Sequence, residues 1–160
     1  VGTFSKSLGS IGGFVSTKKN IAEYIRHKAS AFIFTAALPP ASVAGVIEGL
    51  DILAGDSERR NRLRENTAFI KRAFFEMGVQ VNNNQVPIVP IQIGDEALTL
   101  YMNRLLFDDG IFAGVAVSPV VPPLKAMIRT SYTCAHTKED LGKILTSFEK
   151  NLKKIGVLPQ

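Results

Sequence analysis

The sequence predicts an α/β protein in two parts, in which helices alternate with short apolar strands. Apolar residues recur at helical spacing in long segments, most clearly over residues 57–77. Short apolar runs such as 127–133 are typical of buried strands. Capping residues mark helix starts, above all the pair Thr137 and Asp140. Residues 1–50 therefore read as the end of a larger α/β layer, and residues 51–160 as a compact α+β unit.

The first part is expected to alternate strand, helix, strand and helix. Residues 11–16 follow a Gly/Ser-rich motif and predict a short buried strand, and residues 18–28 predict a helix. The apolar run at 31–35 predicts a second buried strand. Proline is favoured in the first turn of a helix, so Pro39-Pro40 predicts a helix that continues over 41–54.

The second part is expected to contain helix, strand, helix, two strands and helix. Gly78 follows the first of these helices and suits its end, and Gly110 does the same for the second. Pro87 and Pro90 favour an edge or irregular strand, because proline cannot donate to a ladder. The expected elements after residue 77 are a strand at 86–93, a helix at 96–108 capped by Asp95, strands at 111–117 and 127–133, and a helix from Thr137 to about 152.

Composition excludes several classes of protein. Hydrophobic residues make up 46% of the 160 residues and charged residues 21%, which excludes a disordered chain. The net charge of +5 favours a solvated helix face over a nucleic-acid site, because no aromatic residues are interleaved with the basic ones. Attraction to anionic small molecules, or peripheral contact with an anionic membrane, stays open. No apolar run is long enough for a transmembrane helix, and one cysteine, Cys134, forms no intrachain disulfide and fits a reducing cytoplasm.

The beginning of the chain carries its densest motif. Val1 is not a methionine, and a Gly/Ser-rich segment follows at once. Because chain ends fray, we expect that this chain is a piece that lacks its N-terminal portion; a short protein with a processed terminus is the alternative.

The segment from Thr3 to Gly13 carries the chemistry. Its hydroxyl and backbone N–H groups can hold a phosphate, and Lys6 is its single lysine. An apolar strand follows, so Lys6 is expected to point into a partly buried site, where burial favours the neutral, nucleophilic amine. A phosphate cradle beside such an amine suits pyridoxal phosphate. By spacing alone, the segment also fits an exposed loop, and it does not match the nucleotide-binding pattern G-x-x-x-x-G-K-[ST].

Four stretches occur in the order found in one enzyme family. Gly2 to Gly13 resembles the cofactor-lysine segment of the α-oxoamine synthases, which include serine palmitoyltransferase, glycine C-acetyltransferase and 8-amino-7-oxononanoate synthase. Residues 34–40 are similar to the family's F-S-T-S-M-P-P segment, and residues 118–122 to its active-site proline loop. Residues 128–137 resemble its R-x-S…A-H-T segment.

The resemblance implies a fold and a site. The chain would be the C-terminal part of a fold-type I pyridoxal-phosphate transferase: the end of the large cofactor-binding domain over 1–50 and the small C-terminal domain over 51–160. Lys6 would hold the cofactor as a Schiff base, and Thr3 would bind its phosphate. Thr35 would reach the phosphate of a neighbouring subunit, so that a homodimer shares its sites. Arg129 would bind the substrate carboxylate, for which a guanidinium fork is suited, although an exposed surface arginine is the alternative. No metal is implied.

The implied reaction condenses an amino acid, serine or glycine being favoured, with an acyl-CoA in the cytoplasm. Coenzyme A and carbon dioxide leave, and an aminoketone forms. The alternatives are an aminotransferase of the same fold and a non-catalytic subunit or binding module, against which Lys6 argues. Ser118 stands where some members carry an arginine, which puts the loop's carboxylate contact in doubt. His136 is interpreted as structural. The groups that stack on the cofactor ring lie before Val1 in the family, so this chain alone is expected to be inactive.

Overall fold

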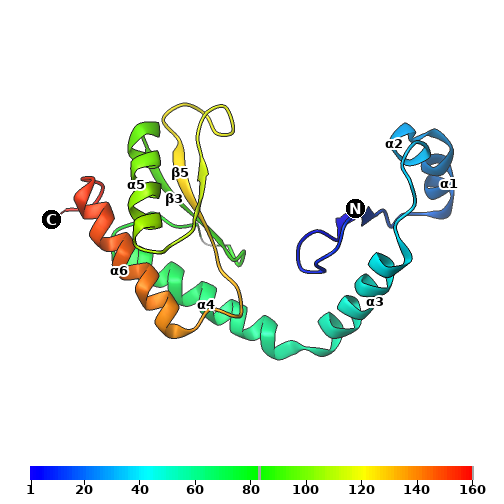
Figure 1. The fold of residues 1–160 in the computed structure, drawn as a ribbon, viewed down its shortest axis with the longest axis horizontal. Helices are drawn as coiled ribbons and strands as arrows, with labels where there is room; N and C mark the ends of the chain where they lie inside the picture. The colour runs from blue at the N-terminus through cyan, green and yellow to red at the C-terminus, as the bar shows by residue number, and fades with distance from the viewer. Residues whose placement is uncertain (83, 160) are drawn as a thin grey trace. The chain divides into compact units, whose positions relative to one another are not determined.

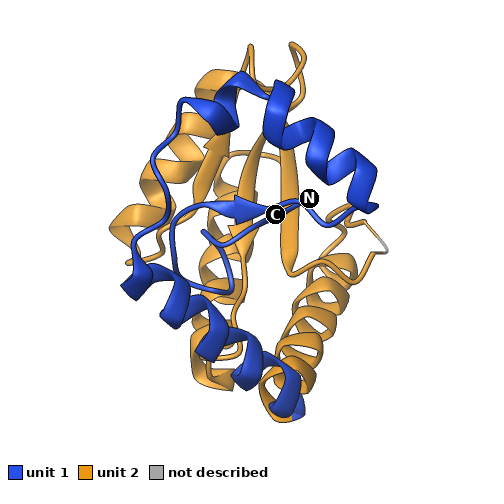
Figure 2. Cartoon of the chain, turned by 90° about the vertical axis from the view of Figure 1, so that its right-hand side faces the viewer, with its two compact units in different colours: residues 1–57 blue, residues 58–160 orange. Residues whose placement is uncertain are grey.

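The computed structural model describes residues 1–82 and 84–159, which form two compact units, Val1–Ser57 and Glu58–Gln160 (Figure 2). The sequence analysis placed a boundary near residue 50. Helix α3 (Pro40–Gly55) continues past that point without a break, so the two units divide after it ends.

The first unit is a small hairpin followed by three helices (Figure 1). Strands β1 (Gly2–Thr3) and β2 (Gly13–Phe14) pair antiparallel, with Gly2 opposite Phe14 and Thr3 opposite Gly13. The helices are α1 (Lys19–Lys28), α2 (Ser30–Ile33) and α3. The helices expected at 18–28 and 41–54 are confirmed, and Pro40 occupies the first turn of α3.

Two strand predictions in this unit are wrong. The run 11–16 is exposed throughout, and only Gly13–Phe14 pairs as a strand, since its partner β1 has only two residues. The run 31–35 lies largely in helix α2, where the N–H of Phe34 donates to the carbonyl of Ser30 at 3.0 Å. A short apolar run does not distinguish strand from helix by periodicity, and here the local hydrogen bonds are helical.

The second unit contains an antiparallel sheet of three strands in the order β3-β5-β4. The strands are β3 (Ile88–Gly94), β4 (Gly114–Ala116) and β5 (Ala126–Ser131). Strand β3 is an edge strand with an irregular register between Gln92 and Gly94, which confirms the expectation drawn from its prolines. Strand β4 is much shorter than the expected 111–117, since only three of its residues pair with β5.

Three long helices complete this unit, and their ends follow the predicted signals. They are α4 (Ser57–Glu76), α5 (Glu96–Asp108) and α6 (Lys138–Lys154). The Asp95 side chain accepts a hydrogen bond from the N–H of Leu98 at 2.8 Å, and Thr137 and Asp140 form a capping box. Gly78 and Gly110 follow their helices with φ of 88° and 83°, values at which glycine is favoured.

One face of the sheet is buried against the three helices, and the opposite face is open. The rings of Phe74 and Phe148 meet edge to face at 5.2 Å between centroids in this core. The strands contribute alternate residues, as a half-buried sheet requires. The hydrophobic side chains of the sheet and helices that have no exposed surface are Val89, Ile91, Ile128, Ile70, Phe74, Met102, Leu106, Phe148 and Leu152.

No helix within the described residues is long and apolar enough to cross a membrane. Across 1–82 and 84–159, no three His, Cys, Asp or Glu side chains gather as a metal-binding group.

Candidate active site

Lys6 lies in the loop that joins β1 to β2. The carbonyl of Lys6 accepts a hydrogen bond from the N–H of Gly9 at 3.1 Å, which closes a tight turn, and Gly9 has φ of 59°. The N–H of Phe4 donates to Gly12 at 3.0 Å, and the N–H of Ser10 donates to Phe4 at 2.9 Å. The Gly/Ser-rich sequence therefore folds as an ordered loop whose backbone bonds leave the Lys6 side chain free.

The Lys6 side chain is exposed, and the expectation of a partly buried lysine is wrong for the residues that the structure describes. Its ammonium group contacts no hydrogen-bond or ion-pair partner among them. The reason is local: both flanking strands have two residues, and the run after the loop is itself exposed. Lys6 is thus an available amine, but its burial is not provided by its own unit.

Hydroxyl groups gather on the same hairpin. The Thr3 and Ser5 hydroxyl oxygens are 2.8 Å apart, and the N–H of Ser5 donates to the Thr3 hydroxyl at 3.3 Å. The Thr3 hydroxyl also lies 3.4 Å from the carbonyl of Gly12, to which it donates. The hairpin therefore brings Thr3 and Lys6 onto one element, with a pair of exposed hydroxyls near the lysine turn.

Thr35 lies in the same unit, just after α2. Its hydroxyl donates to the carbonyl of Ala31, a bond from one helical turn back. Thr35 is exposed, and its oxygen keeps lone pairs that can accept from another group.

Arg129 lies in the second unit, in the middle of the central strand β5. Its side chain belongs to the open face of the sheet, between Pro90 on β3 and Gly114 on β4. Its guanidinium makes no hydrogen bond or ion pair with the residues that the structure describes. The units thus divide the predicted site residues, with Thr3, Lys6 and Thr35 in one and Arg129 in the other.

The loop after β4 is held by Glu96, a residue that the sequence analysis did not identify as functional. The peptide bond between Ser118 and Pro119 is cis, and the N–H of Ser118 donates to a Glu96 carboxylate oxygen at 3.1 Å. Glu96 is the first residue of α5. The sequence placed Glu96 in a helix, but a contact across 22 positions has no local pattern.

The loop between β5 and α6 is fixed by two polar residues. Nδ1 of His136 accepts from the N–H of Thr133 at 3.1 Å, which supports a structural role for this histidine. The Asn66 amide donates to the carbonyls of Thr133 and His136 at 3.1 and 3.0 Å, so it ties α4 to this loop. Nearby, the Tyr132 hydroxyl is buried with no hydrogen-bond partner in the described chain, and burial raises the pKa of Tyr132 to about 12.

A cavity of about 370 Å³ lies between the end of β5 and α6. Thr130, Tyr132, His136 and Phe148 are among its lining residues. A larger cavity of about 990 Å³ lies along α4 beside Lys71. The Lys71 ammonium is already held by neutral oxygens, at 3.0 Å from Asn82 and 2.9 Å from Asn84, so it serves the local structure.

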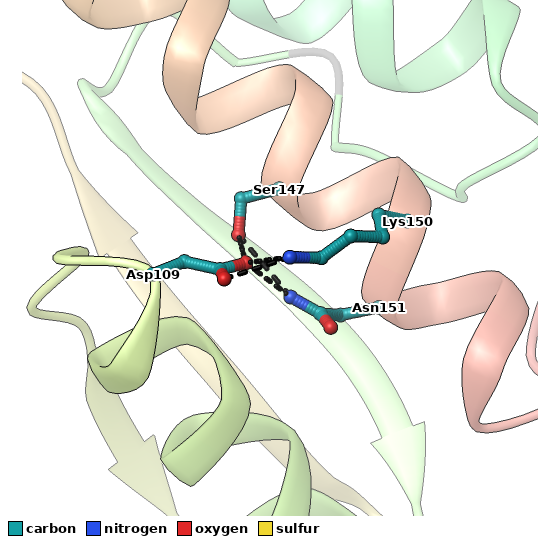
Figure 3. A network of polar contacts seen from close by, with 4 residues as sticks. All are labelled: Asp109, Ser147, Lys150 and Asn151. Atoms are coloured by element: carbon teal, nitrogen blue, oxygen red, sulfur yellow. Dashed lines mark hydrogen bonds and ion pairs between the residues drawn. The ribbon is translucent and has the colours of Figure 1, made fainter.

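The end of α5 is joined to α6 by a polar network around Asp109 (Figure 3). The Ser147 hydroxyl and the Asn151 amide donate to one Asp109 oxygen at 2.6 and 2.9 Å, and the Lys150 ammonium lies 2.7 Å from the carboxylate. The hydrogen bonds from Lys150, Ser147 and Asn151 lower the pKa of Asp109 to about 2. This network stabilises the second unit by joining the end of α5 to α6.

Comparison with known proteins decides the family. A model of the aminotransferase class I and II family matches residues 1–148. The chain belongs to this family. The match covers the Lys6 hairpin and the Arg129 strand, and it confirms the predicted fold class, a fold-type I transferase.

The relatives include two kinds of α-oxoamine synthase. An 8-amino-7-oxononanoate synthase of Thermoanaerobacter pseudethanolicus is 39% identical over 99% of the chain and 40% of the relative. A serine palmitoyltransferase of Bacteriovorax stolpii is 40% identical over 99% of the chain and 38% of the relative. The chain thus spans about two fifths of the length of the curated relatives that it matches.

Solved structures show the same likeness. The Sphingomonas wittichii serine palmitoyltransferase has a TM-score of 0.90 at 29% identity, over 99% of this chain and 40% of that one. A serine palmitoyltransferase with pyridoxal phosphate as an internal aldimine has a TM-score of 0.91 at 30% identity, over 98% of this chain and 40% of that one.

The residues of the first unit fit pyridoxal phosphate. An aldehyde needs an unpaired primary amine, and Lys6 provides one in the described chain. A phosphate needs hydroxyl and N–H donors, and Thr3 and Ser5 place hydroxyls on the same hairpin. The donor set therefore agrees with the cofactor that the resemblance implies.

Proposed function

We propose that this protein is a pyridoxal-phosphate-dependent acyltransferase that condenses an amino acid, serine or glycine being favoured, with an acyl-CoA and releases carbon dioxide. The free amine of Lys6 on a hydroxyl-bearing hairpin carries the proposal. The names of its relatives support it, since the serine palmitoyltransferases and 8-amino-7-oxononanoate synthases cover almost the whole chain.

Each predicted residue has a separate task in this proposal. Lys6 would bind the cofactor aldehyde through Nζ, while the hydroxyl of Thr3 would donate to the cofactor phosphate. Thr35 would add a contact to the phosphate of a second subunit, which makes a homodimer part of the proposal. When bound, the cofactor supplies an electron sink for the bond broken at the amino acid's Cα.

Arg129 would orient the amino acid. Its guanidinium can hold a carboxylate with two parallel hydrogen bonds, and its position in the central strand fixes the direction of the stem. An arginine without an acidic partner is favoured for this task, because no protein carboxylate has to be displaced. Nζ of Lys6 would also accept and return a proton during the reaction.

The loop that begins at Ser118 would border the active site, as the resemblance implies. The Glu96 carboxylate holds the first residue of this loop, and so it would position the loop without touching substrate. A cytoplasmic location that allows peripheral contact with a membrane completes the proposal.

An aminotransferase is the second candidate, because the matching family model carries that description. The two activities differ in their co-substrate. An acyltransferase releases the free thiol of coenzyme A, whereas an aminotransferase converts a 2-oxo acid into an amino acid and needs no thioester.

The test is to load the full-length protein with the cofactor, incubate it with serine or glycine and an acyl-CoA, and follow thiol release. We expect thiol release that depends on the amino acid and disappears in Lys6→Ala. Amino-group transfer to a 2-oxo acid without any thiol release would instead establish the aminotransferase. Neither activity, in a protein that binds the cofactor, would reject both candidates.

A further inference from the structure

A row of three residues crosses the open face of the sheet in the second unit. Arg129 lies in the central strand, opposite Pro90 on one side and Gly114 on the other. Neighbouring strands hold such pairs about 5 Å apart, so a side chain at either position lies against the stem of the arginine. Pro90 presents a fixed ring there. Gly114 presents no side chain, which leaves the β4 side of Arg129 open.

The fold does not require glycine at position 114. A Cβ added there would meet the carbonyl oxygen of Arg129 at 3.5 Å and its Cβ at 3.9 Å, both ordinary contact distances. Its backbone is extended in β4, unlike that of Gly94, whose φ of 97° favours glycine. Glycine also weakens a strand relative to alanine. The absence of a side chain therefore costs stability and gives no backbone geometry that alanine lacks.

We propose that Gly114 is a specificity-determining residue that keeps the guanidinium of Arg129 open to the carboxylate of the amino acid. This inference rests on the proposed function, because it assumes that Arg129 binds that carboxylate. A β-branched side chain at position 114 would pack on the methylene groups of Arg129 and restrict the fork to fewer directions. It would also occupy space that the incoming carboxylate needs, and it would leave the amine end of the substrate untouched.

The test separates carboxylate recognition from every other part of binding. L-Serine and ethanolamine differ only in the carboxylate, and both carry a primary amine that can react with the cofactor. Their dissociation constants are measured by the change in the visible spectrum of the cofactor-loaded protein, without acyl-CoA. The variants are Gly114→Ala, Gly114→Ser and Gly114→Thr, with Ala116→Thr as the matched control, since Ala116 lies on the same strand face but opposite Met127.

We expect the affinity for L-serine to fall progressively from Gly114→Ala through Gly114→Ser to Gly114→Thr. For Gly114→Thr the loss should be about tenfold or more, as for the loss of one charged hydrogen bond. Ethanolamine binding should change by less than about twofold on the same scale. Ala116→Thr should leave the dissociation constants of both ligands unchanged. Should Gly114→Thr fail to fold, the alanine and serine variants still test the trend.

Arg129→Gln distinguishes failure of this inference from failure of the proposed function. If Arg129→Gln weakens serine but the Gly114 variants bind it normally, the role of Gly114 is overturned and that of Arg129 stands. If Arg129→Gln binds serine as the wild type does, the proposed role of Arg129 is wrong and the inference is overturned with it. Equal weakening of serine and ethanolamine in Gly114→Thr would show general distortion, which also overturns the inference.

Discussion

Replacing Asn151 with alanine should lower the free energy of unfolding of the second unit more than replacing Lys150, an exposed residue of the same network. The Asn151 side chain is 1% exposed, and its amide donates to Asp109 at 2.9 Å and to Ser147 at 3.2 Å. Alanine removes both bonds and leaves a small void, at a cost of about 1–3 kcal/mol. Lys150 contacts the same Asp109 carboxylate, but its side chain is 59% exposed. Lys150→Met should therefore cost only about 0–1 kcal/mol.

Urea unfolding followed by circular dichroism measures both variants near neutral pH. Burial decides the order of the two effects, because Lys150 contacts Asp109 from a largely exposed position, whereas the Asn151 amide makes its hydrogen bonds in a buried one. An equal or larger loss of unfolding free energy in Lys150→Met would refute the reasoning.

Acid pH gives an independent check on the same network. The pKa of Asp109 is lowered from 3.8 to about 2, so its hydrogen bonds stabilise the fold fully above the unfolded pKa and lose that effect as pH falls towards the folded one. The stability difference between wild type and Asn151→Ala should narrow between about pH 4 and about pH 2. A difference that widens on acidification would contradict the assignment.

Substitutions at three further positions test helix α6 and the loop at Ser118. Thr137→Ala removes the capping box of α6 and should lower the free energy of unfolding by about 1 kcal/mol, as urea midpoints would show; no change would mean that the cap is not formed. Gly142→Ala, in the same helix, meets no atom within 4 Å and should raise that free energy by about 0.5–1 kcal/mol, whereas a lower value would indicate an unseen clash. Glu96→Ala should speed hydrogen exchange at the Ser118 N–H, while Glu96→Gln keeps an acceptor and should change it much less; equal exchange in both variants would argue against the contact.

The elements that sequence predicted well are those whose signals are local. Helices α4 and α6 combine apolar periodicity with caps or a terminal glycine, and they were predicted to within a few residues. The run 31–35 has five apolar or small residues and no cap, so the choice between strand and helix rested on composition alone and was wrong.

The site was predicted only in part, for a similar reason. The Lys6 loop was visible because its glycines and hydroxyls are adjacent in sequence, but its exposure depends on what covers the hairpin, which no local pattern encodes. Asn66 and Glu96 contact partners 67 and 22 positions away, and they became visible only once strand and helix had been placed. The proposed role of Gly114 likewise depends on its position opposite Arg129 in the sheet, which the sequence alone does not indicate.

The central claim is that Lys6 binds pyridoxal phosphate. The direct test is to incubate the protein with the cofactor, reduce it with borohydride, digest it and locate the modified lysine by mass spectrometry, with Lys6→Ala and Lys71→Ala in parallel. This account predicts that the label lies on Lys6, is lost in Lys6→Ala and persists in Lys71→Ala. A label on another lysine, or an unchanged label in Lys6→Ala, would contradict it.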